Sequence, residues 1–246
     1  MRPPIIGITV HVAEVTAKEG HSEWRFQVAA RYAQAVSEAG GVPLLVPTHA
    51  ATCSSPKDLL GTVDALLLSG GGSIPGQYFL DHPDPSLRDT NPARYDFETE
   101  LVRLAWAERV PLLGICRGHQ TIAEALGGTI VPDLGRVGAR NHYQTEPPTT
   151  ATHPVELVSG SALADWLGPV ATVNSFHRQV VDRPPPGWRA TAVSDDGWVE
   201  AIEAEDGFGL GVQFHPEWLT DRHPGFRRVF EEFVAAARRR PPLSPG

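Results

Sequence analysis

Short apolar runs alternate with amphipathic stretches through the first half of the chain. Uninterrupted apolar runs predict buried strands at 5–10, 42–46, 63–68 and 111–115. Apolar positions at helical spacing predict helices at 26–38, 94–108 and 118–126. The first helix is expected to bury a stripe of Phe26, Ala30, Ala33 and Val36. This alternation of strands and helices indicates an α/β protein with a parallel sheet covered on both faces.

The second half of the chain has a different pattern, in which short strands follow one another with turns between them. The strands are predicted around 154–158, 170–174, 188–194, 198–203 and 209–214, with a short helix at 160–167. A final helix over 224–239 has apolar residues at i, i+3, i+4 and i+7, so it is expected to pack on the core. No second domain or repeat is visible. We therefore expect one domain over 1–240 and a disordered tail at 241–246.

Residues 73–93 contain several prolines and aspartates and have no periodicity. A loop of this length inside a compact domain is either functional or disordered. Because it directly follows a glycine-rich turn, we interpret it as a rim or lid over a site.

Composition restricts the classes of partner. The chain has 246 residues, 41% of them hydrophobic, and a formal net charge of -8. An acidic protein is repelled by nucleic acid phosphates and by anionic membranes, so neither is an expected partner. No apolar run approaches the roughly 20 residues of a membrane span. The N-terminus runs directly into the strand predicted at 5–10, without a signal peptide, which favours the cytoplasm. There the two cysteines, Cys53 and Cys116, can remain free thiols.

Cys116 has the surroundings of a nucleophile. The sequence Gly114-Ile115-Cys116-Arg117-Gly118 places it where a predicted strand ends and a helix begins. This is a cysteine version of the nucleophile elbow, in which the flanking glycines permit a tight turn. The helix N-terminus next to it favours a thiolate and offers N–H groups, notably that of Arg117, to an oxyanion. The alternative is a buried structural cysteine.

A base for this thiol is present at the end of the strand predicted at 209–214. There the chain reads His215-Pro216-Glu217. On an extended chain His215 and Glu217 project to the same side, so the carboxylate can orient the imidazole. The spacing matches no metal motif, because there is no H-E-x-x-H and no close Cys/His cluster. We therefore expect neither a metal nor an organic cofactor.

A second oxyanion donor is expected in Gly70-Gly71-Gly72, because glycines after a strand permit close approach of the backbone to a ligand. The turn lacks the spacing of a phosphate-binding loop. Further along, Arg94 and Asp96 are interpreted as a charge pair at a helix N-terminus, with substrate contact as the alternative.

Seven segments together carry a resemblance to a known family. Near the N-terminus and through the first half they read PIIGIT (4–9), AGGVPL (39–44), DALLLSGGG (64–72), GICRGHQ (114–120) and LGGT (126–129). In the second half they read VNSFHRQ (173–179) and GVQFHPEW (211–218). The chain resembles the class I glutamine amidotransferase-like superfamily, and within it the gamma-glutamyl-gamma-aminobutyrate hydrolases, or PuuD-like group.

The resemblance implies a single-domain, flavodoxin-like core with a mostly parallel sheet flanked by helices. It implies a catalytic triad of Cys116, His215 and Glu217. It also implies that Gly71, Arg117, Gln120, Asn174, Ser175 and His177 lie at the oxyanion or substrate site. For the last three, a turn that closes a strand is an equal alternative. Arg117 is typical of the hydrolases, whereas Gly118-His119-Gln120 is more usual in biosynthetic amidotransferase domains.

The function implied is hydrolysis of a gamma-glutamyl amine, such as gamma-glutamyl-GABA, through a thioester, as in polyamine catabolism. The partner would be this small substrate, and a homodimer is compatible with the resemblance. One alternative is a glutaminase subunit that delivers ammonia to a separate synthase. Another is a non-catalytic binding or regulatory protein on the same fold, because a fold alone does not decide function.

Overall fold

The structure is a computed structural model that describes residues 2–16, 20–48, 55–71 and 92–240. Most of the predicted loop at 73–93, the tail at 241–246 and Cys53 therefore lie outside the described residues. The strands are β1 (Ile5–Thr16), β2 (Ser22–Gln27), β3 (Val42–Pro47), β4 (Ala65–Leu68), β5 (Leu112–Ile115), β6 (Thr129–Val131), β7 (His153–Leu157), β8 (Val170–Val173), β9 (Val180–Arg183), β10 (Trp188–Ser194), β11 (Val199–Ala204) and β12 (Gly209–Val212). The helices are α1 (Ala30–Glu38), α2 (Pro56–Leu60), α4 (Pro92–Ala107), α5 (Arg117–Ala125), α6 (Ala162–Leu167) and α7 (Pro224–Arg239), with 3-10 turns η2 (Leu134–Val137) and η3 (Pro216–Trp218).

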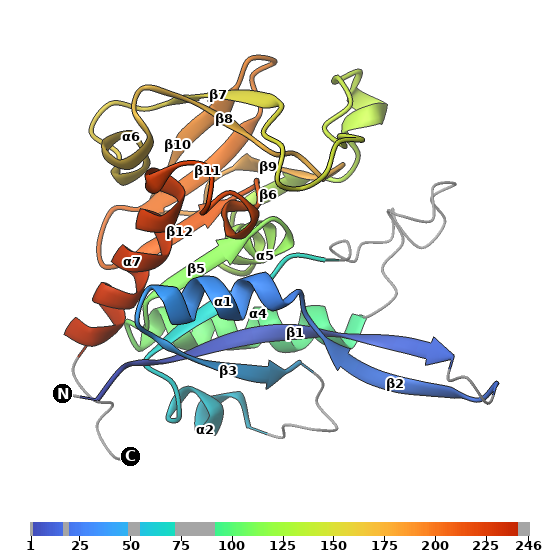
Figure 1. The fold of residues 1–246 in the computed structure, drawn as a ribbon, viewed down its shortest axis with the longest axis vertical. Coiled ribbons are helices and arrows are strands. Elements are labelled where there is room, and N and C mark those ends of the chain that lie inside the picture. Colours follow the sequence, from blue (N-terminus) through green and yellow to red (C-terminus); the bar gives the residue numbers. More distant parts are fainter. Residues whose placement is uncertain (1, 17–19, 49–54, 72–91, 241–246) are drawn as a thin grey trace.

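The strands of the described part form one twelve-stranded sheet with a parallel half and an antiparallel half (Figure 1). In the parallel half the order is β3, β1, β4, β5 and β12. From β12 onward the neighbours β11, β10, β7 and β8 pair antiparallel. The chain therefore has the predicted α/β architecture, with the additional short strands of the second half extending the same sheet.

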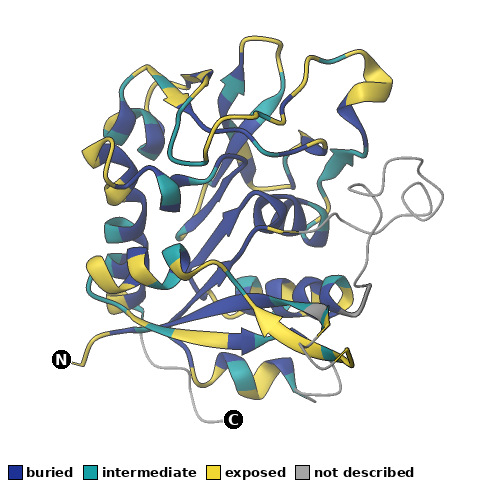
Figure 2. Cartoon of the chain, turned by 45° about the vertical axis from the view of Figure 1, so that its right-hand side comes forward, coloured by how far each residue is buried: buried dark blue, intermediate teal, exposed yellow. Residues whose placement is uncertain are grey.

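Alternation along the central strands divides the core between two faces of the sheet. Leu67 and Leu113 point to one face, where they join the buried side chains of α1 and α7. Leu66 and Leu112 point to the other, where they join those of α4 and α5. Successive residues of a strand face opposite sides, so four consecutive apolar residues in β4 serve both cores. Figure 2 shows the strands buried between these helices.

The prediction for 26–38 was wrong in its first part. Phe26 lies in β2, which pairs antiparallel with the second half of β1, and α1 begins only at Ala30. Residues 22–27 form one strand of a hairpin that lies at the surface (Figure 2). The side chains of Trp24 and Phe26 are exposed there. The buried residues of α1 are Tyr32, Ala35 and Val36, so Val36 alone of the expected stripe is fully buried.

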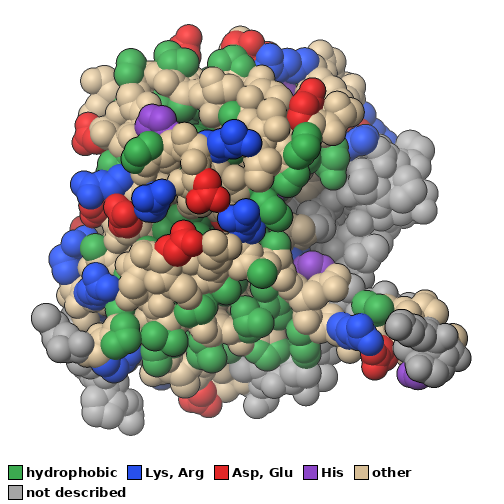
Figure 3. Space-filling model, in the orientation of Figure 1, with side chains coloured by type: hydrophobic (Ala, Val, Ile, Leu, Met, Phe, Trp, Pro, Cys, Tyr) green, Lys and Arg blue, Asp and Glu red, His purple; other side chains and the backbone are tan. Residues whose placement is uncertain are grey.

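No helix in the described ranges is long and apolar enough to cross a membrane. On the face seen in Figure 3, Lys and Arg side chains are interspersed with Asp and Glu. This mixing offers no broad cationic surface on that face.

Candidate active site

Cys116 lies at a sharp turn between β5 and α5. Its backbone has φ 54° and ψ -107°, a conformation that costs free energy for a residue with a side chain. The strand fixes it from one side, because the N–H of Cys116 donates to the carbonyl of Val212 in β12 at 2.8 Å. The side chain is 8% exposed, at the carboxyl edge of the parallel strands. This is the geometry predicted for the nucleophile elbow.

The flanking glycines permit the elbow because strand and helix come into direct backbone contact. A Cβ at Gly114 would lie 2.6 Å from the carbonyl carbon and oxygen of Gly118. A Cβ at Gly118 would overlap the carbonyl of Leu68 in β4. Any side chain at either position would push α5 away from the sheet, so both glycines are required by packing.

His215 and Glu217 form a hydrogen-bonded pair near this elbow. Nδ1 of His215 lies 2.7 Å from Oε1 of Glu217, whose side chain is fully buried. The link between them is the 3-10 turn η3, not the extended chain that we expected, and it brings the two side chains together all the same. Burial opposes a charge on His215, but Glu217 and the Cys116 side chain raise its pKa well above its usual 6.5. His215 is therefore suited to remain an imidazolium.

Gly70 marks the point where the thiol, the imidazole and a tyrosine converge. A Cβ at Gly70 would lie 2.9 Å from Cε1 of His215, 2.9 Å from Oη of Tyr32 and 3.4 Å from Cβ of Cys116. The Gly70 N–H donates to Oη of Tyr32 at 3.0 Å, and that oxygen is 3.4 Å from Nδ1 of His215. Only a residue without a side chain fits at this convergence.

The Ser69–Gly71 turn is held from behind by Arg94, which is fully buried. Its guanidinium donates to the carbonyls of Ser69 at 2.9 Å, Gly71 at 3.1 Å and Gly70 at 3.4 Å. Its Nε donates to Glu98 at 2.9 Å. The partner of Arg94 on α4 is thus Glu98, one helical turn further, and not Asp96, which is exposed. Arg94 organises the turn on which an oxyanion donor was predicted.

A chain of amides lies behind the sulfur. Nε2 of Gln213 is 3.7 Å from Sγ of Cys116, and Oε1 of Gln213 accepts from Nε2 of Gln120 at 3.0 Å. Gln120 also donates to the carbonyl of Gln179 at 2.8 Å and is 2% exposed. Gln120 therefore does not contact the thiol directly and is linked to it through the side chain of Gln213.

The other predicted site residues divide between two places. Asn174 bonds the main chain of His215 through both its side-chain oxygen and its nitrogen. Ser175 and His177 face away, because Oγ of Ser175 donates to the carbonyl of His142 and Nε2 of His177 faces Glu200. Arg117 is buried, with Nη2 3.9 Å from Glu98, so its predicted contribution to the site is limited to its backbone N–H.

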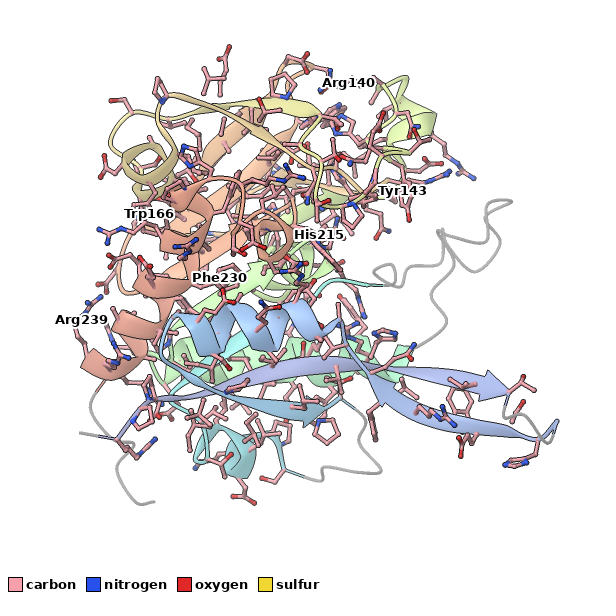
Figure 4. The ribbon with its side chains drawn as sticks, viewed as in Figure 1. Arg140, Tyr143, Trp166, His215, Phe230 and Arg239 are labelled. Carbon is pink, nitrogen blue, oxygen red and sulfur yellow. The ribbon has the colours of Figure 1, made fainter. Side chains whose placement is uncertain are left out.

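Three neighbours of the site were not predicted from the sequence. Tyr32 was overlooked because the helix was placed too early. Gln213 stands two residues before His215 and was quoted only within a motif. Phe176 packs edge-on to His215, with ring centroids 6.1 Å apart, and in turn against Tyr143 (labelled with His215 in Figure 4). Alternation from His215 back along the chain could have indicated Gln213.

Comparison with known proteins places this geometry in context. A family model described as Peptidase C26 matches residues 4–217. Gamma-glutamyl-gamma-aminobutyrate hydrolase PuuD of Escherichia coli K12 is 30% identical over 96% of this chain and 94% of its own. A Mycobacterium tuberculosis protein, provisionally named a glutamine amidotransferase, is 32% identical over 95% of this chain and 75% of its own.

A solved structure supports the fold. The glutamine amidotransferase of Methylobacillus flagellatus superposes with a TM-score of 0.61, at 17% identity over 97% of this chain and 95% of that one. At this identity the likeness shows the shared fold alone.

Proposed function

Because the chain belongs to the Peptidase C26 family of class I glutamine amidotransferase-like proteins, we propose that it is a cysteine-dependent hydrolase of gamma-glutamyl amines. The observation that carries the proposal is the strained elbow of Cys116 beside the His215–Glu217 pair. End-to-end similarity to a gamma-glutamyl-gamma-aminobutyrate hydrolase supports the substrate class.

In the first step the Cys116 thiolate attacks the gamma-carbonyl carbon of the substrate and forms a tetrahedral oxyanion. Imidazolium His215 then gives its proton to the leaving nitrogen, the C–N bond breaks, and a thioester and a free amine result. Glu217 stabilises the charged imidazole and fixes its orientation through the 2.7 Å contact with Nδ1. The other ring nitrogen, Nε2, thereby serves as the proton donor.

The oxyanion would be received by the backbone N–H groups of Arg117 and Gly71. The first belongs to the N-terminus of α5, directly after the nucleophile. For the second, Arg94 holds the carbonyl of Gly70, and the N–H of Gly71 belongs to the same peptide unit. A trans peptide directs its C=O and N–H in opposite directions, so this N–H points away from Arg94. The N–H of Gly70 is already engaged by Tyr32.

In the second step neutral His215 removes a proton from water, which attacks the thioester. The C–S bond breaks and glutamate leaves with its gamma-carboxyl group formed from the water oxygen. The Cys116 thiolate and the imidazolium of His215 are restored, so atoms and charge balance over the cycle. The chemistry needs only the chain's own residues and water.

A glutaminase subunit of a separate synthase is the second candidate. It is favoured by Gly118-His119-Gln120 and by the amidotransferase name of the Mycobacterium relative. Its chemistry at Cys116 would be the same, with ammonia as the leaving group, so the leaving amine separates the two.

The test is glutamate release by the purified protein from gamma-glutamyl-GABA, other gamma-glutamyl amines and glutamine. We expect a gamma-glutamyl amine to be preferred and the Cys116→Ala variant to lose at least about a thousandfold in turnover. Cys53→Ala is the matched control and should keep activity. Mass spectrometry of acid-quenched protein should show a gamma-glutamyl adduct on Cys116.

Undiminished activity in Cys116→Ala would refute the mechanism. Turnover of glutamine alone, stimulated by a co-purifying synthase, would replace the hydrolase with the amidotransferase subunit.

A further inference from the structure

A second cluster of ionisable side chains is buried on the antiparallel half of the sheet. It consists of Glu200 in β11 and three histidines: His153 at the start of β7, and His142 and His177 in the loops before β7 and after β8. All four residues are at most 5% exposed. Their segments are far apart in the sequence, which is why no motif spacing revealed them.

The geometry centres on one carboxylate oxygen. Oε1 of Glu200 lies 3.1 Å from Nε2 of His153, 3.4 Å from Nδ1 of His142 and 3.4 Å from Nε2 of His177. The candidate ligand atoms of His142, His153 and Glu200 all lie within 4.8 Å of one another. A tetrahedral zinc ion with bonds of about 2.0–2.1 Å separates its ligand atoms by about 3.3–3.4 Å. The two separations of 3.4 Å at Glu200 equal an edge of such a tetrahedron, and the separation of 3.1 Å is slightly shorter. His177 would complete the tetrahedron by moving closer to the other two rings, because only His142, His153 and Glu200 form the compact group.

In their neutral forms, two of the histidine rings direct a nitrogen lone pair at Glu200, whereas a proton on His142 is favoured by Glu200 and Asp196, which raise its pKa against the effect of burial. Nδ1 of His177 is 3.0 Å from the carbonyl of Gln179, so this nitrogen carries the hydrogen. Nε2 of His142 is 3.1–3.2 Å from both oxygens of Asp196, so it also carries one. The opposite nitrogens, Nδ1 of His142 and Nε2 of His177, are buried and lie 3.4 Å from Oε1 of Glu200 without good hydrogen-bond geometry. In the neutral rings these lone pairs face a carboxylate, and a cation between them would resolve the repulsion.

The outer contacts are those that orient metal-binding imidazoles. A metal-ligating histidine usually donates its second N–H to a carboxylate or a backbone carbonyl, as His142 and His177 do here. A surface pocket lined by Arg140, Asn141, His142, His177 and Arg178 reaches two of the rings, which gives an ion a path of entry. Figure 4 labels Arg140, at the outer side of this region and away from His215.

We propose that His142, His153, His177 and Glu200 bind one divalent transition metal ion of the zinc type. Three imidazoles and one carboxylate suit zinc in a closed, tetrahedral, structural site. His153 becomes a ligand when Arg140, now 2.5 Å from its Nδ1, turns wholly to Asp195, with which it already pairs. The metal displaces the hydrogen bond from His153 to Glu200.

Such an ion would fasten the segment that holds the catalytic histidine. His142 accepts hydrogen bonds at its carbonyl from Oγ of Ser175 at 2.6 Å and from the N–H of His177 at 3.1 Å. The residue before Ser175 is Asn174, which binds the main chain of His215. The ion would therefore have a structural role, because its ligands reach His215 only through Ser175 and Asn174.

The first measurement is metal content, by mass spectrometry of protein expressed with zinc and purified without a histidine tag. We expect about one zinc per chain in the wild type. Cys116→Ser should keep the same amount, which excludes the Cys116 thiol as the holder. His142→Gln/His177→Gln should fall to about one-tenth or less, whereas the exposed His21→Gln control should not.

A second measurement needs no variant. Protein stripped with a chelator should melt at a lower temperature and recover on addition of zinc chloride, and added cobalt chloride should give the visible absorption of a tetrahedral ion. Wild-type protein that stays free of metal after incubation with excess zinc chloride would overturn the proposal. So would zinc that is lost in Cys116→Ser or retained in the double variant.

Discussion

Asn174 holds the main chain of His215 from both sides. Its Oδ1 accepts from the N–H of His215 at 2.7 Å, and its Nδ2 donates to the carbonyl of the same residue at 3.1 Å. The amide thus fixes the backbone from which the imidazole projects. An aspartate at this position could accept the first bond but could not donate the second.

Asn174→Ala should therefore loosen His215, the proposed catalytic base. Three part-buried backbone groups, the N–H and carbonyl of His215 and the carbonyl of Pro148, lose their partners, which should lower the free energy of unfolding by about 1–3 kcal/mol. A misplaced imidazole should reduce kcat by about tenfold to a hundredfold. Steady-state kinetics and urea unfolding measure the two effects. Asn141→Ala, in an exposed turn, is the control. An unchanged kcat in Asn174→Ala would show that these hydrogen bonds to His215 have no part in catalysis.

Arg94→Lys should separate oxyanion stabilisation from thiol reactivity. Lysine keeps the charge beside Glu98 but cannot hold the carbonyls of Ser69, Gly70 and Gly71 at once. We expect kcat to fall by about ten- to a thousandfold, because the Gly71 N–H loses its fixed direction. Alkylation of Cys116 by iodoacetamide forms no oxyanion, so its rate should change little. Equal losses in both rates would mean general disorder of the site.

The charge on His215 predicts stability that is lost at alkaline pH. The folded-state pKa is raised above 6.5, so the stabilisation is complete below the unfolded pKa and disappears as pH rises through the folded pKa. From about pH 6.5 upward, until the raised folded-state pKa of His215 is passed, this should contribute a slope of up to about 1.4 kcal/mol per pH unit. Glu217→Gln removes the carboxylate that raises the pKa, so its slope should be flatter. Urea unfolding at several pH values measures it, and identical slopes would contradict the assignment.

His119 predicts an effect of the opposite sign. Burial lowers its pKa to about 3, and both ring nitrogens lack hydrogen-bond partners. The unfolded chain takes up a proton below about pH 6.5 that the folded chain does not, so stability is lost as pH falls from there towards 3. His119→Leu should reduce this loss by up to about 1.4 kcal/mol per pH unit. The free energy of unfolding of the two proteins is compared at about pH 7, 6 and 5. A leucine variant with the wild-type acid slope would exclude His119 as the source.

Gly118→Ala should be far more damaging than an ordinary glycine substitution. The added Cβ would overlap the backbone of Leu68, which cannot move without disturbing β4. We expect a loss of at least about 3 kcal/mol or failure to fold. Gly138→Ala is the comparison, because its surroundings are open and its φ of 74° alone should cost about 1–2 kcal/mol. Similar melting temperatures for the two variants would contradict the close packing.

The sequence predicted what depends on local pattern. Residues close together in the sequence determine the apolar runs of β4 and β5 and the glycine-flanked turn at Cys116. Strand, elbow and helix could therefore be predicted there. The hairpin of β2 was missed because Phe26, which is exposed in the structure, was assigned by its apolar character to the buried stripe of the helix that follows. Arg94 was interpreted through its helix, whereas its partners are carbonyls more than twenty residues earlier. The Glu200 cluster arises from tertiary contacts, because β10 separates β11 from β7 in the sheet and the other two histidines come from the loops before β7 and after β8.

The position of β12 has a consequence for synthesis on the ribosome. β12 lies between β5 and β11, so the strand that carries Cys116 keeps one open edge until residue 212 has been translated. The nascent chain therefore displays its thiol and an unpaired apolar strand together while His215, the proposed base, does not yet exist. Open strands of this kind attract other chains. The interval between translation of Cys116 and of His215 is thus the one in which this strand most needs protection, and also the one in which the proposed nucleophile still lacks its proposed base.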